Sequence, residues 1–119
     1  MANIHEYFET ISKRQFKSST GYSKAEFESL YKDFESNFIS LYDCDYSTYL
    51  IENVTEEVKL PTLRSCLFFV LYQLKNDLIY DSLGLTFQMG GSTAHDNFQK
   101  YSILLTDTLE KKSLSKKKF

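Results

Sequence analysis

The sequence predicts an all-α protein. One proline and four glycines among 119 residues leave few breaks in the chain, and long uninterrupted segments favour helices. Apolar residues recur at spacings of three and four in several segments, which indicates helices with one buried face. Alternation of apolar and polar residues, which is typical of a half-buried strand, extends nowhere far enough to indicate one.

The composition is that of an ordinary globular domain. Hydrophobic residues make up 42% of the chain and charged residues 25%, and a chain of this length buries a core without metal or disulfides. The two cysteines, Cys44 and Cys66, lack the Cys/Cys or Cys/His spacing of a zinc site, so we expect no metal and no other cofactor.

The same sequence favours a cytoplasmic location. Its first residues lack the basic, apolar and small-residue order of a signal peptide, and reduced thiols are typical of a cytoplasm. The most apolar run, at 66–74, has about half the length that spans a bilayer. We therefore expect no membrane partner.

The first long helix is predicted to begin at Ser23, which forms a capping-box pattern with Glu26. Residues 43–57 have weaker periodicity and are predicted to form a loop, with a helical turn around 46–52. The helix that begins at Ser23 carries one apolar stripe, made by Phe27, Leu30, Tyr31, Phe34, Phe38 and Leu41.

Three further helices are predicted in the second half. Pro61 fits the first turn of one, where its missing N–H costs nothing, and residues 75–77 end it. The next runs from Leu78 to Gln88, Gly90 and Gly91 break it, and Ser92 opens the last. The buried faces are Leu63, Leu67, Val70, Leu71 and Leu74 in the first of these helices, and Ala94, Phe98, Tyr101, Leu105 and Leu109 in the last. The first is nearly apolar all round in its middle, so we expect it to be central.

Residues 80–101 meet the demands of a helix-turn-helix. Leu83 and Phe87 supply apolar contacts, the two glycines supply freedom in the turn, and the small Ala94 allows the second helix to approach closely. An ordinary helical hairpin meets the same demands, so spacing alone leaves both interpretations open.

Several motifs occur in a characteristic order from Leu60 onward. They are Leu60-Pro61, the apolar run at 67–74, Tyr80-Asp81-Ser82-Leu83, Phe87 and "MGGSTAH" at 89–95, preceded by "RQFKSSTGYSKAEFESLYKDF" at 14–34. In this order, over roughly residues 14–110, the chain resembles the N-terminal helix-turn-helix region of bacterial insertion-sequence transposases of the DDE class. The resemblance divides the chain into an N-terminal helical segment at 1–57, a helix-turn-helix DNA-binding region at 58–112 and a basic tail at 113–119.

The resemblance implies a fold that is all-α, with a C-terminal tri-helical helix-turn-helix, and a function in recognising double-stranded DNA at transposon ends. The DDE catalytic domain or a second protomer would be a further partner. Three features depart from the family pattern: Gln88 replaces a frequent Gly, Gly90 replaces a Ser cap, and Asp96 and Asn97 replace basic residues. The alternative of a helical protein–protein interaction or regulatory module without DNA binding therefore stays open.

The candidate DNA-binding residues lie at the start of the last helix: Ser92, Thr93, His95, Asp96, Gln99 and Lys100. Hydroxyls and free N–H groups at a helix start grip phosphates, whereas His95 and Gln99, one turn apart, would contact base edges. Asp96 would accept from cytosine N4 or simply remain solvated, and each of the others has the same solvated alternative. Lys111, Lys112 and the lysines at 116–118 are expected to be solvated or to attract phosphate.

Charge places any DNA contact in the second half. The net charge is −2, which argues against strong nucleic-acid binding by itself. Residues 1–57 carry eleven acids and five bases, whereas residues 58–119 carry five acids and nine bases, most of that excess in the lysine-rich tail.

We expect no enzymatic activity from this chain. A DDE transposase needs three carboxylates that converge on two metal ions, and in the family they lie on an α/β domain whose pattern is not found here. Neither a Ser/His/Asp or Cys/His arrangement nor a phosphate-binding loop is present. The final "SKKKF" is compatible with a first-frame product of ribosomal slippage, a truncated remnant or a cloned N-terminal domain.

Overall fold

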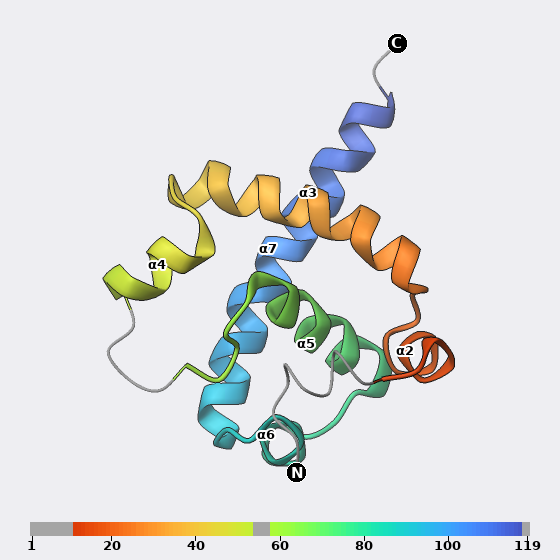
Figure 1. The fold of residues 1–119 in the computed structure, drawn as a ribbon, viewed down its shortest axis with the longest axis vertical. Helices are drawn as coiled ribbons and strands as arrows, with labels where there is room; N and C mark the ends of the chain where they lie inside the picture. The colour runs from red at the N-terminus through yellow and green to blue at the C-terminus, as the bar shows by residue number, and fades with distance from the viewer. Residues whose placement is uncertain (1–10, 54–57, 118–119) are drawn as a thin grey trace.

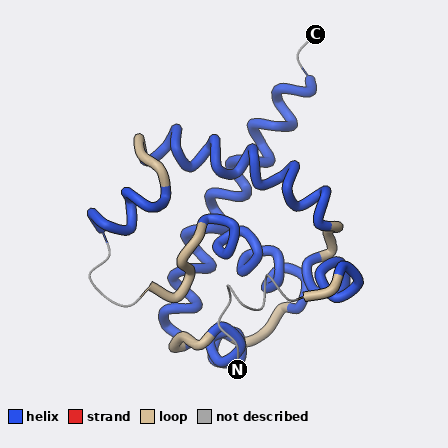
Figure 2. The backbone as a smooth tube through the Cα atoms, in the orientation of Figure 1, coloured by secondary structure: helices blue, strands red, loops and turns tan. Residues whose placement is uncertain are grey.

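A computed structural model describes residues 11–53 and 58–117, with side chains as far as residue 113. All regular structure in these ranges is helical, which confirms the all-α class (Figure 2). The helices are α2 (Lys13–Thr20), α3 (Lys24–Tyr42), α4 (Tyr46–Asn53), α5 (Leu63–Asn76), α6 (Tyr80–Phe87) and α7 (Gly91–Lys117).

Helix α5 lies at the centre, as its apolar middle predicted (Figure 1). Residues 66–70, five in succession, are 0% exposed. Helices α2, α3 and α7 all pack against α5, and α6 packs against α7. The long helix α7 passes α5 and crosses α3 on its way to the C-terminus (Figure 1).

The helix starts are set by local side-chain caps. The predicted capping box is confirmed: the Ser23 hydroxyl accepts from the Glu26 N–H, and the Glu26 carboxylate accepts from the Ser23 N–H. The predicted position of Pro61 is wrong. Thr62 is the N-cap of α5, because its extended backbone lets its hydroxyl accept from the N–H of Ser65, and Pro61 therefore precedes the helix.

Most of the predicted apolar stripes are buried, but their ends are not. Leu41 is 55% exposed and Leu74 is 57% exposed, so their predicted burial is wrong. Asn37 of α3 bonds to Thr108 of α7, and Leu41 lies one turn beyond this contact, in solvent. At the end of α5 the buried residue is Gln73, whose amide bonds to the backbone N–H and C=O of Leu78.

Two predicted boundaries also change. Residues 46–53 form the helix α4 rather than a single turn within a loop. The Gln73 amide holds Leu78 in a non-helical segment, so α6 begins at Tyr80 and is shorter than predicted. In α7, Leu109 is 42% exposed, so its predicted burial is wrong, whereas Ala94, Tyr101 and Leu105 are buried as predicted.

The turn between α6 and α7 does not use its glycines as predicted. The residue in the left-handed conformation is Gln88, with φ of 61°, and neither Gly90 nor Gly91 has a positive φ. Glycine is needed instead for close approach. A Cβ on Gly84 would collide with the carbonyl oxygen of Met89, and one on Gly91 would collide with the carboxylate of Asp81.

Replacing Gly84 with Ala should lower the free energy of unfolding by about 1–3 kcal/mol, because the added methyl group meets backbone atoms that cannot move away freely. Gly90→Ala is the matched control, since a Cβ at Gly90 meets no atom within 4 Å, and it should cost less than Gly84→Ala because it loses only the preference for Gly before a helix start. Urea denaturation measures both. Equal losses in the two variants would contradict the close contact between α6 and the turn.

Candidate nucleic-acid interface

Four of the six predicted contact residues lie together on one solvent-exposed face of α7. Ser92, Thr93, Asp96 and Gln99 are exposed and occupy the first turns of the helix. The opposite side of the same turns is anchored in the core by Ala94, which is fully buried. The face is therefore held in a fixed orientation by the packing behind it.

His95 lies at the edge of this face, beside α6. Its ring meets the ring of Tyr80 edge-on, with 4.8 Å between centroids and 87° between planes. Its Nδ1 atom is 3.4 Å from Oδ1 of Asp96. The side chain is about half-exposed, so it reaches solvent but turns toward α6 rather than directly outward.

Lys100 points away from the face and into a cluster of tyrosines. Its ammonium group donates a hydrogen bond to the hydroxyl of Tyr49 on α4. The same group lies 4.0 Å from the ring centroid of Tyr49, 5.3 Å from that of Tyr42 and 5.4 Å from that of Tyr101. Cation–π contacts of this kind fix a cation in place, so the structure does not bring Lys100 together with the other five residues.

The charge on the α7 face is negative. Asp96 has a side chain that is 81% exposed, and the carboxylate of Asp81 lies against Gly91 at the start of the helix. An acid stabilises a helix N-terminus through the helix dipole, but it also repels a phosphate. The face thus offers hydrogen-bond donors and acceptors for bases, while Ser92 and Thr93 would have to hold a phosphate beside Asp81.

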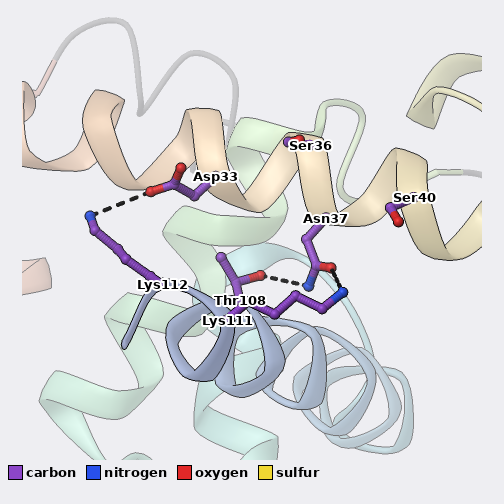
Figure 3. Close-up of a pocket in the computed structure, with 7 residues that line it drawn as sticks. All are labelled: Asp33, Ser36, Asn37, Ser40, Thr108, Lys111 and Lys112. Carbon is purple, nitrogen blue, oxygen red and sulfur yellow. Dashed lines mark hydrogen bonds and ion pairs between the residues drawn. The ribbon is translucent and has the colours of Figure 1, made fainter. Parts of the chain in front are cut away.

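A second candidate region is the groove of about 490 Å³ between α3 and α7 (Figure 3). Buried Asn37 donates to Asp107 at 2.9 Å and to Thr108 at 3.0 Å, and it accepts from Lys111 at 2.6 Å. Lys112 pairs with Asp33 at 3.4 Å. Because these cations already have anionic or amide partners, we interpret the groove as the joint that fastens the two helices.

A third region was missed by the sequence analysis. Four cations, Lys13, Arg14, Lys17 and Lys24, line one pocket of about 740 Å³ between α2 and the start of α3. They are four of the five bases in residues 1–57, and residues 11–25 contain no acid. The signal was present in the sequence, but a charge count over the whole half, with its eleven acids, conceals it.

The remaining chemistry of the described residues is limited. Among them, no three His, Cys, Asp or Glu side chains gather as metal ligands would. Burial raises the pKa of the Cys66 thiol to about 12, which makes it a poor nucleophile. In the part of the chain that the structure describes, no helix is both long and apolar enough to span a bilayer.

The Asn37 joint predicts a pH dependence of stability. The pKa of Asp107 lies below its usual value of 3.8, because Asn37 donates to its carboxylate and Lys111 adds a further bond and charge. A group whose pKa is lowered by folding stabilises the protein above its unfolded pKa, and this contribution is lost as the pH falls through the folded pKa. Asn37→Ala should move the pKa of Asp107 back toward 3.8 and weaken this acid dependence.

Carboxyl chemical shifts followed by NMR from pH 6 to pH 2 measure that pKa directly. Ser40→Ala, which removes a hydroxyl from the same groove and no bond from the Asn37 network, is the matched control. A wild-type Asp107 that titrates at 3.8 or above would show that the joint does not stabilise its charge.

No family model, curated protein or solved structure matches the chain. The relation to transposases accordingly rests on the order and spacing of the sequence motifs, and it remains a prediction.

Proposed function

We propose that this chain is a DNA-binding module, the N-terminal region of a transposase, that recognises transposon-end DNA through the exposed face of α7. The observation that carries the proposal is the alignment of Ser92, Thr93, Asp96 and Gln99 on one side of a helix whose other side is buried. A rigid helix that presents donors and acceptors in this way fits the major groove. The ordered motifs from Leu60 to His95 support the same function.

In this proposal the α7 face supplies specificity and little of the affinity. Base contacts distinguish sequences, whereas phosphate contacts by cations supply most of the binding free energy. The α7 face carries Asp96, Asp81 of α6 lies beside its first residue, and Lys100 is held by Tyr49. The cations that attract DNA must therefore come from another surface of the protein.

Gln99→Ala should reduce the preference for a specific duplex by about 5- to 150-fold, since one good base contact contributes about 1–3 kcal/mol of discrimination. Fluorescence anisotropy measures this, with labelled duplexes taken from the DNA on either side of the coding sequence and scrambled duplexes of equal composition. Thr106→Ala, an exposed change two turns farther along α7, is the control and should leave the preference unchanged.

Asp96→Ala, which removes both the acceptor and the charge, separates the two roles open to Asp96 in the same assay. Loss of preference would identify Asp96 as an acceptor from cytosine, whereas tighter binding to every duplex would identify it as a charge that repels phosphates. A wild-type protein that binds specific and scrambled duplexes equally would contradict the proposed readout by α7.

A protein-interaction module is the second candidate function, favoured by one observation. Ile103 is 70% exposed and lies four residues after Gln99 on the same face of α7. An apolar side chain beside an acidic, hydrogen-bonding surface suits a protein partner better than it suits a phosphate backbone.

If α7 mediates self-association, sedimentation equilibrium should show a dimer at micromolar concentrations, and Ile103→Ser should shift it to a monomer because the apolar contact is lost. Ile51→Ser, a change at another highly exposed apolar residue, on α4, is the control. Monomers at every concentration, in the wild type and both variants, would exclude self-association through this face.

A further inference from the structure

One pocket of the molecule concentrates positive charge. Lys13, Arg14 and Lys17 project from α2, and Lys24 joins them from the first turn of α3, together with the hydroxyls of Ser18 and Ser23. Among the residues that the structure describes, no acid lines this pocket. In a chain of net charge −2, such a gathering of cations costs repulsion that an anionic ligand would relieve.

The three cations of α2 lie on one side of the helix. The spacing of Lys13, Arg14 and Lys17 puts all three on the outward side, over a rise of about 6 Å. The opposite side is anchored by Phe16, whose ring meets that of Phe27 at 5.2 Å between centroids and that of Phe68 at 5.6 Å. The core therefore fixes the helix that carries these three cations.

These three cations are available to a ligand. All three side chains are exposed, and none forms an ion pair with another described residue. Lys24, by contrast, donates to the carbonyl oxygen of Ile11 at 3.3 Å. Among the described residues, Glu26 is an acid whose charge interacts with Lys17 through space. The Glu26 carboxylate, however, already accepts a hydrogen bond from the Ser23 N–H.

We propose that this pocket binds the phosphodiester backbone of nucleic acid, as a contact separate from the α7 face. This proposal shares one premise with the proposed function, namely that the chain binds DNA. The pocket supplies the positive charge that the α7 face lacks. Figure 1 shows that α2 and the start of α7 lie on different sides of the molecule, with α5 and α6 between them.

The chemistry of the pocket favours a nucleic-acid backbone over other anions. Exposed cations bind a single phosphate weakly in water, whereas a duplex carries one charge per about 1.7 Å and releases counterions when it is neutralised. An anionic membrane is disfavoured because the apolar side of α2, with Phe16 and Thr20, is buried in the core and is not free to insert.

The test is a salt series. Each phosphate neutralised contributes about 0.9 to the slope of log K against log salt concentration. The triple variant Lys13→Gln/Arg14→Gln/Lys17→Gln should therefore lower the magnitude of that slope by about 3, and should weaken binding to specific and scrambled duplexes by the same factor, at least tenfold at low salt. The single variant Arg14→Gln should lower the slope by about 1.

The matched control removes three charges elsewhere. Lys32→Gln/Lys111→Gln/Lys112→Gln changes the net charge equally at the α3–α7 side, and it should leave the slope within about 1 of the wild type because those cations contact Asn37, Asp107 and Asp33 or lie apart from the pocket. Glutamine is a good helix former, and far-UV circular dichroism confirms that each variant is folded.

The outcomes separate this proposal from the readout by α7. A reduced slope in the pocket variant, with Gln99→Ala without effect, would support the pocket and contradict the α7 readout. An unchanged slope with a normal sequence preference would overturn the pocket and leave the function intact. An equal slope change in the control would show that net charge alone explains the effect, and it would contradict binding at the pocket. No binding to any duplex at low salt would overturn both, as would binding to phosphatidylserine–phosphatidylcholine vesicles in its place.

Discussion

The exclusion of the middle of α5 from water on every side is the constraint on which the rest of the structure depends. A helix with five consecutive buried residues, 66–70, needs neighbours all round it, because each exposed turn would leave a large apolar side chain in solvent. Phe16 of α2 packs against Phe68, and Phe87 of α6 packs against Phe69 at 5.0 Å between centroids. Helices α2, α3 and α7 supply most of this enclosure.

The exposed faces of α2 and of the start of α7 differ in charge. The α2 surface gathers cations, whereas the α7 surface presents amide, hydroxyl and carboxylate groups. If the chain binds DNA, this arrangement divides attraction from discrimination between two helices. With such a division, the sequence of one surface can change without loss of the contacts made by the other surface. The position of Lys100 fits this view, since it stabilises α4 against α7 rather than the recognition face.

The features that depend on neighbouring residues could be predicted from the sequence. Ser23 and Glu26 are three residues apart and cap the helix that they begin, and the apolar middle of α5 predicts a central helix. The exposure of Leu41 and Leu74 could not be predicted, because it depends on which other helices pack against the ends of α3 and α5. Helical periodicity identifies a face, but it does not show how far along the face a partner extends.

The candidate site follows the same division. The exposure of Ser92, Asp96 and Gln99 agrees with their positions outside the apolar stripe, which is local information. The position of Lys100 depends on Tyr49, fifty-one residues earlier in the chain. The two glycines predicted to relax the turn are not in the left-handed conformation, and Gln88 is. The basic pocket lies within the single short segment 13–25, and a charge averaged over a whole half of the chain conceals it.

The joint at Asn37 also bears on how the chain acquires its structure. Its partners Asp107, Thr108 and Lys111 lie 70 to 74 residues farther along the sequence, and a ribosome delivers a chain from its N-terminus. Helix α3 is therefore synthesised long before α7, and the part of its surface that packs against α7 stays uncovered until α7 is made. Contacts this distant slow folding, so the first half of the protein passes through an interval in which it is vulnerable to aggregation and to proteolysis.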